Sequence, residues 1–435
     1  MNARVNPASS PPAWVVLPFF LVAPAGILVA GALVAVSGSD LAVALNRPEN
    51  IAAVHAIVLG WASTTIMGAL YQLGAAVFGS APPHPFLVRL QLGLHVLGVT
   101  TFLIAIHEWA RTWMVAGAGC LVASFGLFVA TQGMAIVRGS GRGLARDYGI
   151  VAMGFLVLVA AVGVAFTTGL RWGWWGITDG RLAAHAHLGA IGWVGLLVMG
   201  VSYQLVPMFN VVSGTHPRFG RLALGLTAGS LLVFAAAMWT DPPVGMRLGL
   251  ATCVAAGPAL WSVDQLRLIR ARSRRKLDIQ GLGTLTSVVM LWLTMATGVG
   301  LVATGAGRGG DEPLRWIIVY GVFGLFGFPG AALIGNSYKI VPFLVWYHRY
   351  RPLVGRQRVP TLADIYSERL ARTVLSLFVV ATFALVAGVI VGEGGMVTAG
   401  GLLIMTTGAL HGVGLLQTLL PKASTRLMSA SEVTR

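Results

Sequence analysis

Residues 183–211 read AAHAHLGAIGWVGLLVMGVSYQLVPMFNV and contain no Lys, Arg, Asp or Glu. A helix needs about 20 mostly apolar residues to cross the hydrocarbon core of a bilayer. The run is long enough, so it predicts a membrane-spanning helix. Two histidines, His185 and His187, stand near its amino-terminal end, where ionisable side chains are costly and often functional.

The composition of the whole chain predicts many such helices. Of the 435 residues, 56% are hydrophobic and 10% are charged, whereas a soluble domain carries about 25% charged residues. A water-soluble globular enzyme is therefore excluded, and the abundant apolar residues also exclude intrinsic disorder. Because the apolar segments are continuous rather than alternating, a transmembrane barrel is excluded too. The sequence predicts an all-α polytopic membrane protein in contact with the lipid bilayer.

About twelve runs are long enough to span a membrane. Their approximate limits are 13–36, 51–79, 86–108, 112–137, 147–169, 181–210, 219–240, 247–268, 282–304, 314–346, 370–392 and 395–420. Twenty-three Lys and Arg residues fall on the side of the two termini and seven on the opposite side. By the positive-inside rule, both termini face the cytoplasm. The basic excess thus indicates orientation rather than a nucleic-acid partner, and we expect no cleavable signal peptide.

The stretch at 183–211 has two relatives within the chain. Residues 51–79 align with it without a gap at an offset of 132, the first repeat offset, and residues 318–346 align at an offset of 135, the second repeat offset. The first alignment pairs His55 with His187 and matches the Gly-Trp, Met-Gly and Tyr-Gln-Leu motifs that follow. The second pairs Gly189, Gly192, Gly195 and Gly200 with Gly324, Gly327, Gly330 and Gly335. Such ordered matches predict an internal repeat.

The repeat predicts a single membrane domain, residues 1–435, built of three four-helix units about a pseudo-threefold axis. The repeats are centred on 51–79, 183–211 and 318–346, and all three helices run from the outside inward, as in parallel repeats. The glycines of these helices allow a partner to approach the helix backbone closely. That partner is either a neighbouring helix or the face of a flat cofactor.

Six histidines within or at the ends of the predicted spans are candidate ligands, since imidazole is the usual axial ligand of haem iron and a common copper ligand. His55, His185 and His187 lie about 5–10 Å below the outer surface. His107 ends a span on that side, and His95 and His411 lie near mid-membrane. The candidate cofactor-binding residues are His55, His187, His185, His411 and His95, and the candidate metal ligands are His55, His185, His187 and His107.

Within residues 181–210, His185 and His187 differ by about 200° around the helix, so they face different neighbours. His185 shares a face with Gly189 and Gly192, which would place an imidazole above a shelf of glycines. The same histidines have simpler interpretations, because an intramembrane imidazole can merely hydrogen-bond across helices. Two other functions therefore stay open: a transporter or channel, and a cofactor-free structural or assembly subunit of a respiratory complex.

The segment Ala184-His185-Ala186-His187-Leu188, followed by Gly192-Trp193 and Tyr203-Gln204-Leu205-Val206-Pro207, resembles subunit I of the haem-copper oxidase superfamily. The likeness is to its short C-type oxidase and nitric oxide reductase relatives, and NnrS-like proteins are a second similar group. The resemblance implies a b-type haem, with copper as a further candidate, and electron transfer or nitric oxide and dioxygen chemistry at the outer side. It implies that His55 matches a low-spin haem ligand and that His187, or His185, matches a metal-site histidine.

The resemblance further implies a bacterial-type inner membrane, a cytochrome c or quinol-linked electron donor and respiratory partner subunits. Two departures limit it. The family has a His-x-His pair in the tenth span and a histidine pair in the seventh, whereas residues 314–346 and 219–240 contain none. The orthodox binuclear oxygen-reducing site therefore cannot be assembled. Whether the protein is an enzyme stays open, and His95, His107 and His411 are the candidates for alternative second ligands.

Overall fold

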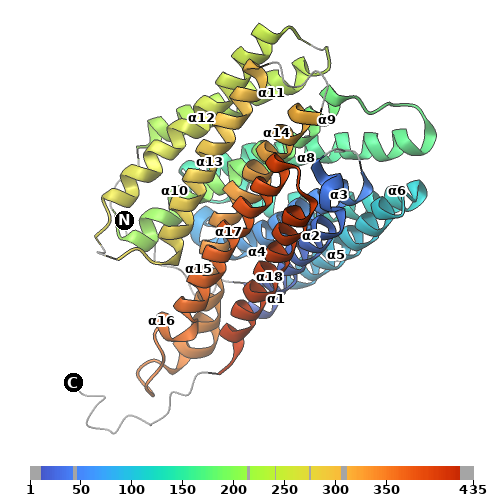
Figure 1. Ribbon diagram of the computed structural model, residues 1–435. Helices are drawn as coiled ribbons and strands as arrows, with labels where there is room; N and C mark the ends of the chain where they lie inside the picture. Colours follow the sequence, from blue (N-terminus) through green and yellow to red (C-terminus); the bar gives the residue numbers. More distant parts are fainter. Residues whose placement is uncertain are drawn as a thin grey trace.

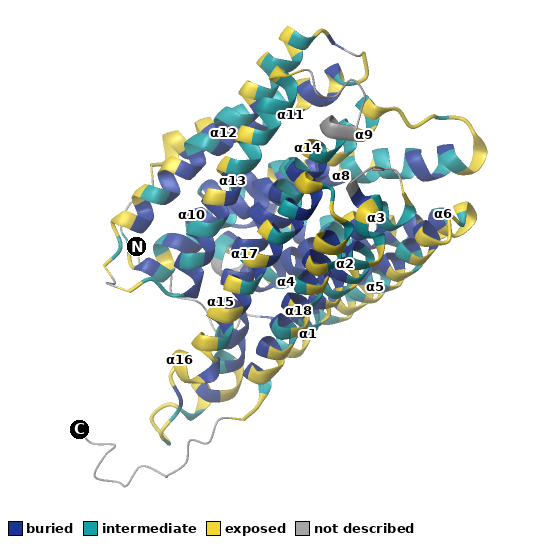
Figure 2. Cartoon of the chain, viewed as in Figure 1, coloured by how far each residue is buried: buried dark blue, intermediate teal, exposed yellow. Residues whose placement is uncertain are grey.

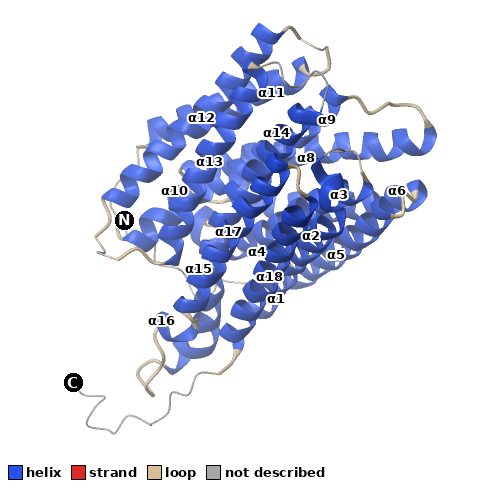
Figure 3. Cartoon of the chain, viewed as in Figure 1, coloured by secondary structure: helices blue, strands red, loops and turns tan. Residues whose placement is uncertain are grey.

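The computed structural model describes residues 11–42, 47–212, 216–240, 242–273, 276–304 and 311–421. In this part of the chain the regular secondary structure is helical, and Figure 3 shows helices joined by loops without a strand. Twelve helical segments among the described residues are long and apolar enough to cross a membrane. The predicted all-α polytopic fold is thereby confirmed.

We number these segments as spans 1 to 12 in chain order. Their bounds are Ala13–Leu41, Pro48–Leu73, Pro85–His107, Arg111–Arg138, Leu144–Trp172, Asp179–Asn210, Pro217–Ala237, Val244–Arg270, Ile279–Ala303, Leu314–Leu353, Glu368–Val391 and Gly394–Leu419. Spans 3, 5, 7, 8, 9, 11 and 12 are the single helices α5, α8, α11, α12, α13, α17 and α18. A short helix, α16 (Leu362–Ile365), lies between spans 10 and 11.

The other spans are built of several helical segments. Span 1 contains α1 (Ala13–Val22) and α2 (Pro24–Ser37), and span 4 contains α6 (Arg111–Phe128), η5 (Val129–Gly133) and α7 (Met134–Arg138). Span 2 contains α3 (Pro48–His55), η3 (Ala56–Ser63) and α4 (Thr64–Leu73). Span 6 contains α9 (Asp179–His187), η6 (Leu188–Gly195) and α10 (Leu196–Asn210). Span 10 begins within α14 (Asp311–Gly321) and continues through η7 (Val322–Gly327), α15 (Phe328–Val345), η8 (Trp346–Tyr350) and η9 (Arg351–Leu353).

The segments η3, η6 and η7 are π-helical turns in the three spans that the repeat relates. The turns at Ala56–Ser63 and Leu188–Gly195 begin and end at positions that the first repeat offset pairs. A π turn changes the direction of the side chains that follow it and is frequent at functional sites. The residues beside these corresponding turns are therefore candidates for a functional site.

Spans 2, 6 and 10 form the centre of the bundle. In their most apolar windows 67%, 56% and 67% of the residues are buried, against at most 50% in any other span. The turn η3 contacts both η6 and η7, while outside this centre α17 packs on α18 and α18 closes back on α2 (Figure 1). Figure 2 shows buried residues between the helices and exposed residues on the outward faces.

The repeated glycines pack against the preceding span. A Cβ atom at Gly60 would lie 3.2 Å from the Cα of Gly26 in span 1, and one at Gly192 would lie 2.5 Å from the ring of Phe155 in span 5. The pattern continues in span 10, since a Cβ at Gly327 would lie 3.2 Å from the sulfur of Met290 in span 9. Of the two partners expected for the glycines, a neighbouring helix is the one found at these positions. The pseudo-threefold relation stays a prediction, and these matching contacts support it.

Candidate functional site

The amino-terminal ends of spans 2 and 6, predicted to lie on the outer side, place two imidazoles against each other. His55 is the last residue of α3, and His185 lies in the last turn of α9. Their ring centres are 6.5 Å apart, with 30° between the ring planes. The structure therefore brings together one histidine from each of the first two repeats, and the partner of His55 is His185 rather than His187.

Hydrogen bonding orients the His55 ring. Its Nδ1 lies 2.7 Å from the carbonyl oxygen of Ile51, one turn earlier in α3. A carbonyl oxygen only accepts, so Nδ1 carries the proton of the neutral ring and Nε2 keeps its lone pair. Metal-binding histidines commonly donate their other ring N–H to a carbonyl in this way. His55 thus has the hydrogen bonding of a metal ligand.

His187 faces a different neighbour. Its Nδ1 lies 2.7 Å from the carbonyl oxygen of Ala183, while its Nε2 lies 2.8 Å from the hydroxyl of Tyr320 at the end of α14. Because Nδ1 donates to the carbonyl, the Tyr320 hydroxyl donates to Nε2. Both ring nitrogens of His187 are therefore hydrogen-bonded within the protein.

Aromatic rings enclose the two histidines of the pair. Phe102 in α5 contacts His55 edge-on at 5.4 Å between ring centres, and Phe166 in α8 contacts His185 edge-on at the same distance. Phe166 is backed by the stacked indole of Trp175, with ring centres 5.1 Å apart. Among the described residues, the buried Nδ1 of His185 has no hydrogen-bond partner. Its ring is thus held by packing rather than by a hydrogen bond.

The glycine shelf expected beside His185 is filled. A Cβ at Gly189 would lie 3.4 Å from Val159, and Gly192 faces Phe155, both from α8. This stripe of α9 and η6 therefore serves helix packing at these two positions. It does not present an open face to a flat cofactor there.

His95 links two helices. Its Nε2 lies 3.1 Å from the carbonyl oxygen of Leu59 and 3.1 Å from the hydroxyl of Thr64, both in span 2. The ring is buried, and the carbonyl belongs to the π turn η3. This is the interhelical hydrogen bond that the simpler interpretation of His95 expects.

The two remaining candidates lie elsewhere. His411 is buried in α18 against the ring of Tyr338, with ring centres 5.4 Å apart, and His107 is exposed at the end of α5. Among the described residues, no three His, Cys, Asp or Glu side chains are grouped so that they could hold a metal ion. Protein ligands to a metal at this end of spans 2 and 6 would thus be the two imidazoles of His55 and His185.

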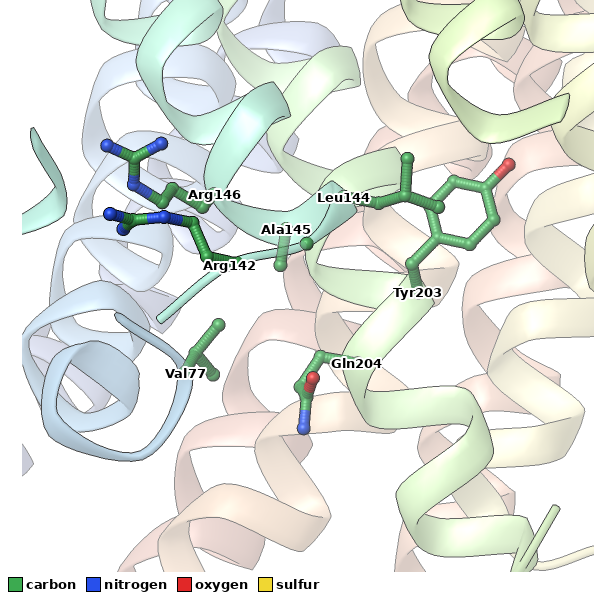
Figure 4. Close-up of a pocket in the computed structure, with 8 residues that line it drawn as sticks. Val77, Arg142, Leu144, Ala145, Arg146, Tyr203 and Gln204 are labelled. Atoms are coloured by element: carbon green, nitrogen blue, oxygen red, sulfur yellow. The ribbon is translucent and has the colours of Figure 1, made fainter. Parts of the chain in front are cut away.

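A cavity of about 160 Å³ lies on the side predicted to face the cytoplasm. It is lined by Val77, Arg142, Gly143, Leu144, Ala145, Arg146, Tyr203 and Gln204 (Figure 4). In Figure 4 the guanidinium groups of Arg142 and Arg146 point away from Tyr203 and Gln204. They donate instead to the carbonyl oxygens of Gly139 and Ile136 at the end of α7. The cavity offers no convergent set of charged donors, and we assign it no function.

Sequence reasoning did not identify Tyr320, nor Phe102 and Phe234, which pack beside His55 and His187 with ring centres 5.4 and 4.7 Å apart. The repeat could have indicated them, because the first repeat offset pairs Phe102 with Phe234 and the second pairs His185 with Tyr320.

No protein-family model matches the chain, and a search of curated proteins finds no similar sequence.

Proposed function

We propose that this membrane protein is a haem protein, or a haem–copper protein, similar in build to subunit I of the haem-copper oxidases. His55 and His185 would hold the metal near the outer end of the bundle, for electron transfer or for chemistry on nitric oxide or dioxygen. A cytochrome c or a quinol-linked protein would donate electrons, and respiratory subunits would be further partners. The chain would reside in a bacterial-type inner membrane with both termini in the cytoplasm.

The pair of imidazoles carries this proposal. Two imidazoles that bind one metal from opposite sides have ring centres about 6 Å apart, since each metal–nitrogen bond is about 2 Å long. The observed separation of 6.5 Å is close to this value. The hydrogen bond from Nδ1 of His55 to Ile51 leaves Nε2 as the free ligand atom. His55 and His185 would therefore be the residues that hold a metal between spans 2 and 6.

The same donor set favours one of the two chemistries. A haem iron, when bound, supplies one-electron transfer and, at an open axial position, the binding of diatomic gases. If His55 and His185 both held the iron, they would leave no place at the iron for a gas to bind. The geometry thus favours electron transfer over chemistry on nitric oxide or dioxygen.

The test is the visible spectrum and metal content of the full chain purified in detergent. We expect a Soret band and stoichiometric iron or copper in the wild type, and loss of either signal in His55→Ala and in His185→Ala. His187→Ala is the matched control, because the ring nitrogens of His187 are already hydrogen-bonded, and it should keep the wild-type spectrum. A wild type without a Soret band and without metal above background contradicts the proposal, as does an unchanged spectrum in both ligand variants.

One observation favours a second candidate function, a cofactor-free structural or assembly subunit. Gly189 and Gly192, for which the sequence left either a neighbouring helix or a flat cofactor as the partner, are packed against α8. A subunit that kept the fold without the cofactor would show this packing. Copurification with respiratory subunits, with no haem or metal in this chain, would favour it over the first proposal.

A further inference from the structure

The structure contains two imidazoles in equivalent surroundings. The first repeat offset pairs His55 with His187, and each is the last residue before a π turn, η3 or η6. The Nδ1 of each ring lies 2.7 Å from the carbonyl oxygen one helical turn earlier. The backbone and the first hydrogen bond are therefore the same at both positions.

The aromatic neighbours are equivalent as well. Phe102 lies 5.4 Å from His55 and Phe234 lies 4.7 Å from His187, measured between ring centres. The two phenylalanines are themselves paired by the first repeat offset, in the spans that follow spans 2 and 6. A phenylalanine from the following span thus packs beside each of the two imidazoles.

His55 and His187 differ in the aromatic ring that the next central span places beside each of them. His55 faces His185 at 6.5 Å and 30°, whereas His187 faces Tyr320 at 5.7 Å and 26°. The second repeat offset pairs Tyr320 with His185. The place between spans 6 and 10 is therefore the counterpart of the histidine pair, with tyrosine in the place of histidine.

The tyrosine prevents a metal from binding His187. Its hydroxyl lies 2.8 Å from Nε2 and donates its proton to the lone pair that a metal would need. The hydrogen-bonded geometry is thus the alternative to a metal site.

We infer that Tyr320 closes a second imidazole site between spans 6 and 10, so that residue 320 determines how many metals the chain holds. The inference rests on the proposed function of the His55–His185 pair, which is the open counterpart. In the wild type, His187 holds spans 6 and 10 together through Tyr320 and does not bind metal.

Copper ions test the inference on the full chain in detergent, after loosely bound metal has been removed with a chelator. Bound Cu(II) is counted by atomic absorption, and its nitrogen ligands are identified by electron paramagnetic resonance. We expect His187→Ala to bind as much copper as the wild type. We expect Tyr320→His to bind one additional copper per chain, and the double variant Tyr320→His/His187→Ala to lose that addition.

A second measurement does not depend on a new metal site. In Tyr320→Phe the Nε2 lone pair of His187 is released, so we expect diethyl pyrocarbonate to modify His187 several-fold faster than in the wild type. Mass spectrometry of the peptide that contains residues 183–211 measures the rate. His95, which is buried away from Tyr320, is the internal control and should react at an unchanged rate.

Two results overturn the inference. One is loss of wild-type copper in His187→Ala, and the other is a Tyr320→His variant that binds no more copper than Tyr320→Phe, with unchanged modification of His187. Failure of the proposed function gives a different result. The wild type would then bind no copper that depends on His55, while Tyr320→His would still gain copper that depends on His187.

Discussion

The indole Nε1–H of Trp193 donates a hydrogen bond to the hydroxyl of Ser63, with 2.9 Å between the two heavy atoms. Both side chains are buried, and Ser63 ends the π turn of span 2 while Trp193 lies in that of span 6. The bond joins two of the three central spans through the π turns that follow His55 and His187. It therefore links the stability of the bundle centre to the geometry of the candidate site.

Removal of this hydrogen bond should lower stability measurably. Interhelical hydrogen bonds in membrane proteins contribute about 0.6 kcal/mol on average and up to about 1.7 kcal/mol. We expect Ser63→Ala to lower the free energy of unfolding by about 1 kcal/mol, because the indole N–H is left buried without an acceptor. Unfolding in mixed detergent and SDS measures the loss. Thr406→Ala is the control, since Thr406 is exposed and bonds only within its own helix; an equal loss in both variants contradicts the prediction.

The packing role of the repeated glycines predicts opposite effects at two positions. An alanine at Gly192 would place its Cβ 2.5 Å from the ring of Phe155, so we expect Gly192→Ala to cost about 1–3 kcal/mol. A Cβ at Gly225, in α11, meets nothing within 4 Å. We expect Gly225→Ala to be neutral or to stabilise by about 0.5 kcal/mol, because alanine favours the helix. Thermal unfolding of both variants in one detergent tests the contrast, and a Gly192→Ala variant as stable as wild type contradicts it.

Much of the fold could be predicted from the sequence, because uninterrupted apolar runs and terminal charges determine where a span begins and ends. The run predicted at 370–392 is the helix Glu368–Val391, and the run predicted at 181–210 is Asp179–Asn210. Periodicity also placed His185 and His187 on different sides of one helix. It could not show which helix each would meet, since that depends on how distant spans pack.

The same limit applies to the rest of the site. The sequence left open whether Gly192 faces a helix or a cofactor, and only the position of Phe155 in a neighbouring span decides it. Tyr320 was not identified because it is ordinary within its own span and is informative only beside His187. The π turns leave no compositional signal, so the direction of the residues after them could not be predicted.

A partly buried ion pair connects spans 9 and 10. The ammonium of Lys339 lies 2.9 Å from the carboxylate of Asp278, both side chains are 18% exposed, and the carboxylate also caps α13 by accepting from the N–H of Gly281. We expect Lys339→Met and Asp278→Asn each to cost about 1–2 kcal/mol after allowance for their residual exposure. Asp278→Ala should cost about 1 kcal/mol more, because it also removes the cap. Denaturant unfolding ranks the variants, and equal losses in Asp278→Ala and Asp278→Asn contradict the capping role.

The short helix α16 should depend on pH. The Thr361 N–H and hydroxyl donate to the Asp364 carboxylate at 2.8 and 2.7 Å and lower the pKa of that group below its usual 3.8. A carboxyl with a lowered pKa in the folded state stabilises it above the unfolded pKa and loses this effect as pH falls through the folded one. We expect amide-exchange protection of Leu362–Ile365, relative to Asp364→Asn at the same pH, to decline as pH falls below about 4 and to be lost once pH is below the lowered pKa. A protection ratio that stays constant from pH 6 to pH 3 contradicts it.

Phe166, which packs against His185, should control metal binding at the histidine pair. The buried Nδ1 of His185 has no hydrogen-bond partner among the described residues, so packing, including the edge contact with Phe166, holds the ring beside His55. We expect Phe166→Ala to weaken Cu(II) binding about 10-fold or more, as substitutions that disturb the support of a ligand do. Phe234→Ala is the control, because Phe234 packs beside His187, which we infer does not bind metal. Calorimetric titration with Cu(II) compares the affinities of the two variants. Equal losses of affinity would mean that Phe166 acts through the general stability of the bundle rather than through His185.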